Sequence, residues 1–349
     1  MISKLIIAHL HVWDKKNKGD RAIIEAVQEL LKKQIPQATI RDYPVQLLKG
    51  ASPAMLNKIN QADLVVIGGG GIFYHWFLPY DIVTIQAIKK PMVIFGVGYI
   101  REEGARALEV KEKQTIGFLC QQAELIGVRD YYTKEFLIKV GVANKKIKVI
   151  GDPAIFLSEK KTNKVNLKPK IKIGFNINYS GWLGFGKYKD RILDSYEYTA
   201  NYFQKKYNAG IYYLNHHPSE AIIRKELKIK NLQLVDLPTR QQKFVYSKFD
   251  LIIGMMLHSC VMAFGAGTPE INLAYDLRNR SFAKFINHRE LVISPSELRP
   301  VVLLKKALNV FKKRELYKRK FKQRKKKIWQ NQFAFLKKIV QLASKIPNK

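Results

Sequence analysis

Apolar residues along the chain alternate between short continuous runs and longer segments with a helical period. In the first half, the continuous runs that predict strands lie at 4–12, 38–43, 63–73, 91–100 and 125–130. Amphipathic segments that predict helices lie between them, at 20–35, 53–62, 110–123 and 131–142, and a last apolar stretch closes the unit at 146–156. Strands and helices that alternate in this way predict a parallel sheet with helices on both faces.

A polar, lysine-rich stretch at 158–170 interrupts the pattern, which then starts again. Predicted strands follow at 171–180, 209–218, 232–237, 250–255 and 269–276, with predicted helices at 191–207, 220–227, 240–249 and 257–264. We therefore expect an α/β protein of two tandem, doubly wound, Rossmann-like domains at 1–157 and 171–304, joined by a linker at 158–170. A cleft between the two domains is the expected place for an active site.

Basic residues are concentrated at the C-terminal end. The 349 residues include 62 Lys and Arg against 28 Asp and Glu, and the segment 305–349 holds 17 of the basic residues and a single acid. Its stripe of apolar positions, which includes Phe333, Leu336 and Ile339, predicts a basic amphipathic helix. Such a helix either packs its stripe on the body of the protein or lies on an anionic membrane surface. Nucleic acid is not an expected partner, because no nucleic-acid-binding motif accompanies the charge.

Two features bear on the compartment. Two cysteines, Cys120 and Cys260, are too few for a disulfide framework and fit a reducing environment. The N-terminal apolar run is broken by His9 and His11 and lacks a signal-peptide cleavage pattern, and no segment is a convincing transmembrane helix. We expect a cytoplasmic protein, with peripheral contact at the inner face of the membrane as one role for the basic helix.

One ionisable residue, His258, stands in a run without charged residues at 251–269. The stretch "LIIGMMLHSC" predicts a buried strand that breaks at Gly254 and a short helix that follows it. His258 is then placed at a strand-to-helix turn, and ligands of open α/β sheets bind at the carboxyl ends of strands. A structural histidine and a catalytic one both fit this position. Cys260 suits a buried thiol better than a nucleophile paired with His258.

Three further segments place candidate residues after predicted strands. "NKGDRAI" puts Asn17, Gly19 and Asp20 at the start of a helix, where Asp20 serves either as the N-cap or in binding. "VVIGGGGIF" predicts a glycine turn whose residues Gly69, Gly70 and Gly71 contact a ligand or allow tight packing.

The third segment, "GVRDYYT", leaves Arg129 and Asp130 at a strand end, where the guanidinium binds an anion or pairs with its neighbour. A further pair of histidines, His216 and His217, ends another strand and either lines the cleft or is structural. No metal-ligand spacing was identified.

Taken in order, these segments resemble the polysaccharide pyruvyl transferase family. The matching motifs are N-x-G-D-x-A at 17–22, the glycine-rich segment at 62–73, G-V-R-D at 127–130, G-D-P-A at 151–154, G-M-x-L-H-S at 254–259 and Y-D-x-[K/R] at 275–278. The resemblance covers about residues 1–290 and implies a two-domain, GT-B-like fold. It also implies transfer of pyruvate from phosphoenolpyruvate to a sugar as a ketal, with no metal and no cofactor.

The resemblance assigns roles to particular residues. It implies His258 as the general acid, donor contacts at Arg129, Arg278 and Leu257, and an acceptor or cleft role for the segments at 17–20 and 69–71. The N-terminal domain is then the acceptor side and the C-terminal domain the donor side. The expected acceptor is a sugar of a cell-surface polysaccharide or its lipid-linked oligosaccharide precursor. A histidine with a near-neutral pKa suits proton delivery to the methylene carbon of the donor.

One position departs from the family pattern. Met256 stands where the family usually has an arginine that binds the anionic donor, and a thioether carries no charge. Arg280 or Lys284 could supply the missing cation. Two other functions stay open at this point: a glycosyltransferase of the same architecture that uses a nucleotide sugar, and a family member without catalytic activity.

Overall fold

The computed structural model describes residues 5–12, 14, 16–74, 80–101, 105–177 and 185–346. Within these ranges, the first sheet consists of six parallel strands in the order β2-β1-β3-β4-β5-β6. The strands are β1 (Ile6–His11), β2 (Thr39–Pro44), β3 (Leu64–Phe73), β4 (Met92–Tyr99), β5 (Ala123–Val128) and β6 (Ile147–Val149). The helices between them are α1 (Lys18–Gln34), α2 (Pro53–Asn60), α3 (Ile82–Ala87), α4 (Val110–Gln122) and α5 (Tyr131–Lys139).

Both faces of this sheet are buried. Successive residues of β1 belong to two apolar clusters: Ile7 packs with α1, and Ala8 packs with the cluster that includes residues of α2 and α4. A strand that is apolar on both sides is typical of a parallel sheet covered by helices.

The second sheet repeats this architecture. It is parallel, and its strands in the described part of the chain follow the order β12-β11-β10-β7-β8-β9. Its strands are β7 (Lys172–Phe175), β8 (Gly210–Leu214), β9 (Gln233–Val235), β10 (Leu251–Gly254), β11 (Glu270–Leu273) and β12 (Val292–Ile293). Its helices are α6 (Lys189–Tyr207), α7 (Ala221–Glu226), α8 (Thr239–Tyr246), α9 (Leu257–Ala266), α10 (Leu277–Ile286) and α11 (Pro300–Lys312).

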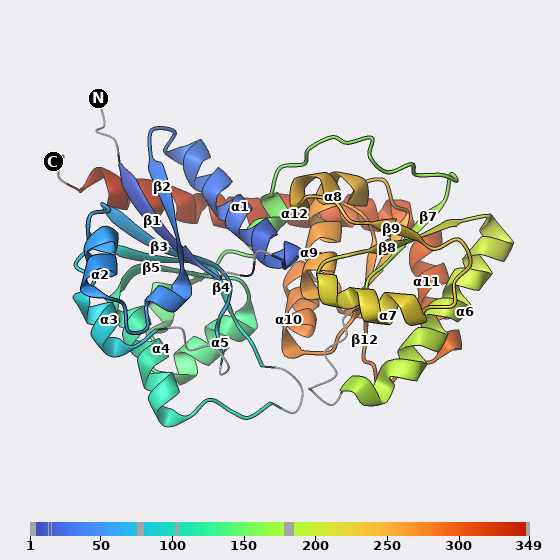
Figure 1. Ribbon diagram of the computed structural model, residues 1–349, viewed down its shortest axis with the longest axis horizontal. Helices are drawn as coiled ribbons and strands as arrows, with labels where there is room; N and C mark the ends of the chain where they lie inside the picture. Colours follow the sequence, from blue (N-terminus) through green and yellow to red (C-terminus); the bar gives the residue numbers. More distant parts are fainter. Residues whose placement is uncertain are drawn as a thin grey trace.

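Short 3₁₀ helices lie between these elements: η1 (Val45–Leu47), η2 (Asn144–Lys146), η3 (Pro153–Phe156), η4 (Phe185–Tyr188), η5 (Pro218–Glu220) and η6 (Arg289–Leu291). The predicted α/β fold of two doubly wound sheets is confirmed (Figure 1). The exact domain and linker boundaries stay a prediction.

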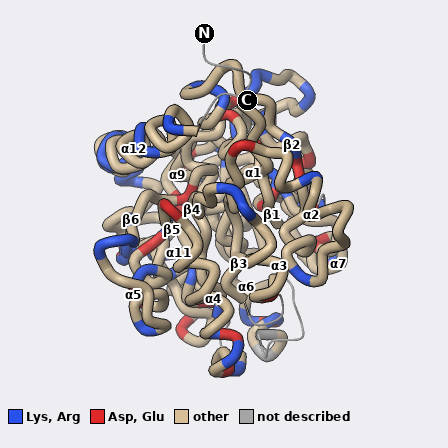
Figure 2. The backbone as a smooth tube through the Cα atoms, turned by 90° about the vertical axis from the view of Figure 1, so that its left-hand side faces the viewer, with Lys and Arg blue, Asp and Glu red and all other residues tan. Residues whose placement is uncertain are grey.

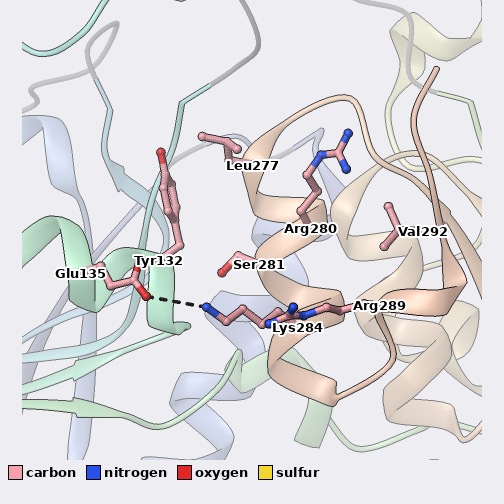
Figure 3. Close-up of a pocket in the computed structure, with 8 residues that line it drawn as sticks. All are labelled: Tyr132, Glu135, Leu277, Arg280, Ser281, Lys284, Arg289 and Val292. Carbon is pink, nitrogen blue, oxygen red and sulfur yellow. Dashed lines mark ion pairs between the residues drawn. The ribbon is translucent and has the colours of Figure 1, made fainter. Parts of the chain in front are cut away.

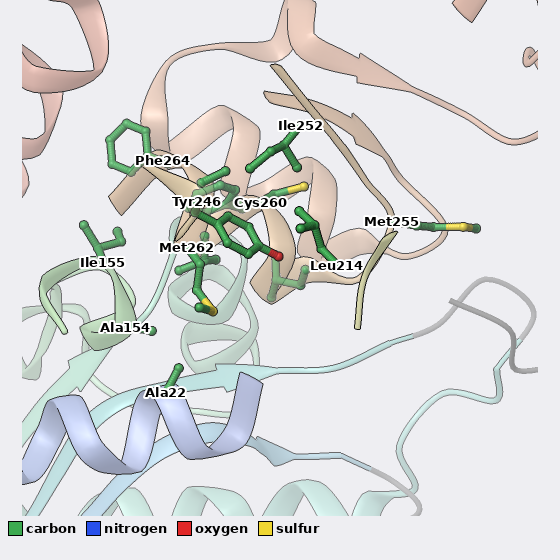
Figure 4. Packing of buried hydrophobic residues seen from close by; sticks show 14 of the residues in the cluster. Ala22, Ala154, Ile155, Leu214, Tyr246, Ile252, Met255, Cys260, Met262 and Phe264 are labelled. Atoms are coloured by element: carbon green, nitrogen blue, oxygen red, sulfur yellow. The ribbon is translucent and has the colours of Figure 1, made fainter. Parts of the chain in front are cut away.

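One apolar cluster continues from the first half into the second. Ala22 of α1, Ala154 and Ile155 of η3 and Met262 and Phe264 of α9 all belong to it (Figure 4). Packing of this kind holds the two sheets in a defined relation, which a site built from both halves requires.

A buried lysine and a network of ion pairs tie the same two halves together. The Nζ of Lys243 in α8 donates to the carbonyls of Ala154, Ile155 and Leu157 at 2.8–3.0 Å. In α1, Glu29 accepts from Arg240 of α8 and from the Ser158 amide.

The basic C-terminal segment forms a long helix, α12 (Arg314–Ser344), that runs back across both halves (Figure 1). Its apolar stripe, which includes Phe321, Ile328, Phe335, Leu336 and Ile339, is buried against the body. Phe335 stacks on Phe95 of the first sheet at 5.9 Å between ring centroids. Of the two arrangements predicted for this helix, the structure shows the packed one.

Many residues of α12 are Lys or Arg (blue in Figure 2), and the exposed ones among them are Arg319, Lys320, Lys322, Lys326, Lys327, Lys337 and Lys338. Among the helices within the described ranges, none combines the length and apolarity that crossing a bilayer requires.

The glycine segment differs from its predicted conformation. Gly68–Gly71 lie inside β3 and not in a turn after it, although the pairing of β3 with β4 shifts register between Gly70 and Phe73. Gly69 and Gly70 have φ of 78° and 83°, which places the irregularity at residues without a Cβ.

Three α-helices and one strand of the described chain were not predicted: the helices α3, α10 and α11 and the short strand β12. At α10, the charged residues after β11 were interpreted only as candidate ligands. The predicted strands 4–12 and 171–180 and the tail 305–349 extend beyond the described residues, which include neither 4, 178–180 nor 347–349.

Candidate active site

His258 lies where β10 meets α9, at the boundary between the two halves. Met256 is the N-cap of α9 and His258 is the second residue of the helix, so the predicted strand-to-helix position is confirmed. The His258 side chain is 12 % exposed, and its Nε2 lies 3.5 Å from Oδ2 of Asp152. Asp152 belongs to the first half, where it follows β6 and caps η3. An imidazole of the second half thus faces a carboxylate of the first.

The other imidazole nitrogen lies beside Gly19, in the first turn of α1. A Cβ atom at position 19 would lie 2.4 Å from Nδ1 and 2.6 Å from Cγ of His258, far closer than atoms in contact approach. Position 19 therefore requires glycine. The absent side chain lets the imidazole pack directly against α1, while Nε2 faces Asp152.

Asp152 and Arg129 form the buried side of the site. Asp152 is fully buried, and its Oδ1 accepts a hydrogen bond from the Ala154 amide at 2.9 Å. Burial raises the pKa of Asp152, but the hydrogen bond and charge of His258 and the charge of Arg129 outweigh it and hold the pKa below its usual value. Asp152 is therefore a carboxylate at neutral pH and orients the imidazole.

Arg129 is held behind this carboxylate. Its NH1 lies 3.9 Å from Asp152 Oδ2, and its Nε donates to Asp130 at 3.3 Å, so the predicted pair of Arg129 and Asp130 is present. The residue is 3 % exposed and lies against Gly98, where a Cβ atom would be 2.4 Å from its NH2. In this conformation Arg129 supports Asp152, and its contact with a donor stays a prediction.

Asp20 is not the N-cap of α1, and that interpretation was wrong. The cap is Asn17, whose Oδ1 accepts from the amides of Gly19 at 2.9 Å and Asp20 at 3.4 Å. Asparagine three positions earlier is an equally good cap, so the helix starts before Asp20. Burial raises the pKa of Asp20 to about 6, and the charges of His258, Arg278 and Arg129 oppose this rise. Contacts of Asp152 with His258 and Arg129, and of His258 with Gly19 next to Asp20, bring predicted residues of the two halves together.

Arg278 lies at the start of α10. Asp276 is the N-cap of this helix, and the Arg278 Nε donates to its Oδ2 at 2.6 Å. The guanidinium also donates to the Tyr275 hydroxyl at 3.3 Å, and its side chain is 16 % exposed. The motif Y-D-x-R thus holds the cation in a defined position at the edge of the site.

A cavity of about 360 Å³ lies between α5 and α10, one turn along the helices that begin at Asp130 and Asp276 (Figure 3). Arg280 and Lys284, the predicted substitutes for the missing arginine, both line it. Lys284 pairs with Glu135 at 3.7 Å, and Arg280 donates to Ser294 at 2.5 Å. A cavity of this size suits a small ligand. Its charged lining residues are three cations, Arg280, Lys284 and Arg289, and one carboxylate, Glu135.

The N-terminus of α9 offers backbone donors beside His258. No side chain caps this helix within the described residues, because the residue at the N-cap position is Met256 and a thioether is a poor acceptor for backbone amides. The Met256 amide itself donates to Asn176. Leu257 is 3 % exposed and packs in the apolar cluster, so it can offer a ligand little more than its amide. Amides at a helix N-terminus favour an anion.

The three glycines predicted at the cleft each pack against a side chain. A Cβ atom would lie 1.9 Å from Ile23 at Gly69, 2.8 Å from Val12 at Gly70 and 1.8 Å from Ile100 at Gly71. Tight packing therefore accounts for these residues, and an acceptor contact stays a prediction.

The neighbouring Cys260 and His216 are buried structural residues. Burial raises the pKa of the Cys260 thiol well above its usual value, and its sulfur faces the Gly254 carbonyl. The Nε2 of His216 lies 2.6 Å from the Tyr246 hydroxyl, and its carbonyl accepts from the Lys18 amide at 3.0 Å. Burial, followed by the charges of Lys18 and His258, lowers the pKa of His216 well below its usual value.

A family model described as polysaccharide pyruvyl transferase matches residues 17–276, well over half of the chain. The chain belongs to the polysaccharide pyruvyl transferase family. The matched segment begins at Asn17 and includes every predicted site residue except Arg278 and the two candidate substitutes Arg280 and Lys284. No curated protein sequence matches the chain.

Solved structures show the same architecture in other enzymes. UDP-GlcNAc 2-epimerase of Neisseria meningitidis, bound to UDP-GlcNAc, is 11 % identical with a TM-score of 0.59, over 97 % of this chain and 100 % of that chain. HepE of Anabaena, in complex with UDP and glucose, is 12 % identical with a TM-score of 0.58, over 97 % and 99 %. MnaA of S. aureus, bound to UDP, is 10 % identical with a TM-score of 0.60, over 91 % and 90 %. At this identity the likeness extends to the GT-B-like fold alone.

Asp152 is the site residue that the sequence analysis of this pyruvyl transferase family member did not select. It lies in the G-D-P-A motif, directly after an apolar run, and that position was the available signal. Its partner His258 is far away in the sequence, so only the packing of the two halves reveals the pair.

Proposed function

We propose that this family member transfers pyruvate from phosphoenolpyruvate to two hydroxyls of a saccharide, forming a cyclic ketal and releasing phosphate. The observation that carries the proposal is the arrangement of His258. One ring nitrogen faces a buried carboxylate, and the other lies beside Gly19, whose lack of a Cβ allows the ring to take this position at the boundary of the two halves.

The first step is protonation of the donor. Protonated His258 pairs through Nε2 with Asp152, and its Nδ1–H delivers a proton to the methylene carbon of phosphoenolpyruvate. The adjacent carbon then becomes an oxocarbenium-like centre. Asp152 remains ionised and keeps the imidazole in place, as a general acid requires.

The second step joins the sugar. A hydroxyl oxygen attacks the oxocarbenium carbon, and Asp20 as a carboxylate accepts the hydroxyl proton. The bond to the phosphate oxygen then breaks and phosphate leaves with the electron pair. The leaving phosphate takes the proton from Asp20. A second hydroxyl attacks the same carbon, gives its proton to the now neutral His258 and closes the ketal ring, which restores both groups. The pKa of about 6 suits Asp20 to this role, because the group is ionised at neutral pH and is still a useful base.

The donor carries a carboxylate and a phosphate, so the loss of a cation at Met256 needs compensation. We assign this to the amides at the start of α9, to Arg278, and to the basic cavity that Arg280 and Lys284 line. Amide donors and guanidinium groups both bind such oxygens through charge-assisted hydrogen bonds.

The acceptor in this proposal is a polysaccharide or its lipid-linked precursor, and the basic face of α12 brings the enzyme to an anionic membrane. Attraction to such a surface is about 1 kcal/mol per nearby basic residue. Leu336 and Ile339 are buried against the body, so they are not available for insertion into lipid. Membrane contact is then electrostatic.

The test is a turnover experiment in deuterated buffer, followed by NMR. Phosphoenolpyruvate and a pool of lipid-linked saccharides should yield phosphate and a ketal whose methyl group carries one solvent deuteron. Consumption of a nucleotide sugar, with phosphoenolpyruvate unchanged, would instead establish the glycosyltransferase alternative.

A further inference from the structure

Two histidines and one aspartate converge on the first sheet, on its two adjacent strands β1 and β2. His9 and His11 are two residues apart on β1, so their side chains project to the same face. Asp42 of β2 is the register partner of His9. Their ligand atoms lie within 4.8 Å of one another, with Asp42 Oδ1 3.9 Å from His9 Nδ1 and 3.6 Å from His11 Nε2.

Each imidazole is oriented by a backbone carbonyl on its other nitrogen. His9 Nε2 lies 3.3 Å from the Gly68 carbonyl, and His11 Nδ1 lies 2.9 Å from the Val12 carbonyl. Because a carbonyl only accepts, these nitrogens carry the hydrogens in the neutral rings. The nitrogens that face Asp42 are then lone pairs, and a carboxylate with two imidazole lone pairs is a set of ligands for a cation.

Gly68 allows this arrangement. A Cβ atom there would lie 2.7 Å from His9 Nε2, so the glycine lets the ring approach β3 closely enough to donate to it. A histidine that binds a metal usually donates its other ring N–H to a carboxylate, a backbone carbonyl or a water molecule.

A fourth ligand is within reach. The Gln28 amide nitrogen lies 2.5 Å from Asp42 Oδ1 and 3.5 Å from His9 Nδ1. Half a turn of this amide places Oε1 at the same point, where it can bind a cation. A water molecule could also complete the set.

The surroundings attract a cation although the chain is strongly basic. The described residues that line a cavity of about 180 Å³ next to His11 include three carboxylates, Asp14, Glu25 and Asp42, and one cation, Arg21. Arg21 is itself paired with Glu25 at 3.5 Å. Among these described residues carboxylates outnumber cations, although the net charge of the protein is +34, and such a lining attracts a divalent ion.

We propose that His9, His11 and Asp42 bind one divalent transition-metal ion, with Zn²⁺ preferred. Two imidazoles and one carboxylate form a donor set that zinc takes. Tetrahedral bonds of about 2.0–2.1 Å set the ligand atoms roughly 3.4 Å apart. The two distances to Asp42, 3.9 and 3.6 Å, need changes of a few tenths of an ångström. The two imidazole nitrogens lie within 4.8 Å of each other, so their separation has to shorten by up to about 1.4 Å through rotation of the rings. The ion would join β1 to β2 immediately before the segment that leads to Asn17.

The site was missed in the sequence because the His-x-His spacing becomes a ligand pair only on a strand. Its third member lies on a neighbouring strand, which the sequence does not pair with the first. The site does not depend on the proposed pyruvyl transfer.

The test uses the full-length chain, stripped with a chelator and titrated with Zn²⁺ by calorimetry and with Co²⁺ by visible absorption. The expected result is one bound ion per chain, with the visible bands of tetrahedral cobalt. His11→Gln and Asp42→Asn should each weaken binding at least about tenfold. Gln28→Glu should tighten it, because it adds a carboxylate.

The matched control is His288→Gln, which removes another histidine paired with a carboxylate, Glu290 at 2.8 Å. It should leave metal affinity unchanged. Circular dichroism without metal checks that each variant is folded, and Asp42→Asn serves if His11→Gln is not. Absence of metal uptake by the parent, or equal loss in the His288 variant, would overturn the proposal.

Discussion

Gly19→Ala is the substitution whose effect follows most directly from the geometry of the site. The added Cβ would lie 2.4 Å from His258 Nδ1, whereas ordinary contacts start at about 3.4 Å. The imidazole must therefore move by about 1 Å, because the new methyl group would also lie 2.6 Å from Cγ and 2.9 Å from Cβ of His258. A misplacement of about 1 Å in a catalytic group lowers turnover by about 100-fold.

The fold should survive the same change with some loss of stability. Gly19 lies in the first turn of α1 with a φ outside the positive region, and alanine is favoured over glycine in a helix by up to about 1 kcal/mol. The clash with the His258 ring and with its Cβ at 2.9 Å opposes this gain, because overpacking costs about 1–3 kcal/mol. The variant should therefore melt slightly below the parent while its folded fraction loses turnover. A purely structural role for Gly19 would lower the melting temperature and leave the turnover of the folded protein unchanged.

The assay is phosphoenolpyruvate-dependent phosphate release in the presence of saccharide, together with NMR of the His258 ring. Gly117→Ala is the matched control, because it makes the same change in α4, where the nearest heavy atom to the new Cβ is the Val140 carbonyl at 3.2 Å. Parent-like turnover and unmoved His258 signals in a folded Gly19→Ala protein would refute the proposed orientation of the acid.

Four further predictions follow from the same contacts. His258→Gln should lower kcat by about 10²–10⁴-fold while affinity for phosphoenolpyruvate, measured by calorimetry, stays near the parent value. Asp20→Asn should lower kcat and remove the acid limb of its pH profile. In the parent, kcat should fall as pH drops through about 6, because Asp20 becomes protonated. An unchanged acid limb in the variant would exclude Asp20 as the base. Glu29→Gln should lower the free energy of unfolding at neutral pH by about 3 kcal/mol. Burial opposes ionisation of Glu29, but hydrogen bonds from Lys33, Ser158 and Arg240 outweigh it and hold its pKa at about 2 in the folded protein, against 4.5 in the unfolded chain. An acid whose pKa is lowered by folding stabilises the fold at any pH above its unfolded pKa. Urea titrations should therefore show the difference in unfolding free energy between parent and Glu29→Gln vanish as pH falls from 4.5 toward 2. The control Glu124→Gln, on the surface, should change the unfolding free energy little. Glu substitutions at the exposed Lys322, Lys326 and Lys337 of α12 should abolish salt-sensitive cosedimentation with anionic liposomes, while Glu at Lys49, Lys58 and Lys89 should not; equal binding by both sets would contradict the membrane role.

Truncation at residue 304 is not a suitable test of the membrane role. It would remove α12, whose Phe321, Phe335 and Leu336 are buried in the shared apolar cluster, and loss of large core side chains commonly costs about 3–5 kcal/mol each. Charge reversal at exposed residues of α12 is therefore the better test, because it leaves the buried side chains of the helix in place.

Local pattern was sufficient to predict the elements that carry the site. The apolar run that ends at Gly254 placed His258 correctly at the start of a helix, and the alternation of strands and helices predicted both sheets. Errors arose where two residues compete for one local role. Asn17 and Asp20 can both cap α1, and the sequence does not indicate which oxygen reaches the amides.

The remaining features depend on contacts between distant segments. Gly19 and His258 meet only because α1 packs against α9, and Asp152 becomes a partner of His258 only in the assembled fold. Strand pairing likewise brings Asp42 to His9. The glycines of β3 show the opposite kind of error. Their composition is typical of a ligand-binding loop, but in the fold they allow close packing of side chains against the strand.

Calorimetric titration of the parent chain with phosphoenolpyruvate and, separately, with UDP-GlcNAc is the most direct test of the proposed donor. Pyruvyl transfer requires binding of phosphoenolpyruvate and none of UDP-GlcNAc. We also expect that Arg278→Met weakens binding by about 1.5–3 kcal/mol and that Arg106→Met, on the surface, does not. Binding of UDP-GlcNAc without phosphoenolpyruvate would contradict the account in favour of a nucleotide-sugar enzyme, and binding of neither would favour a family member without this activity.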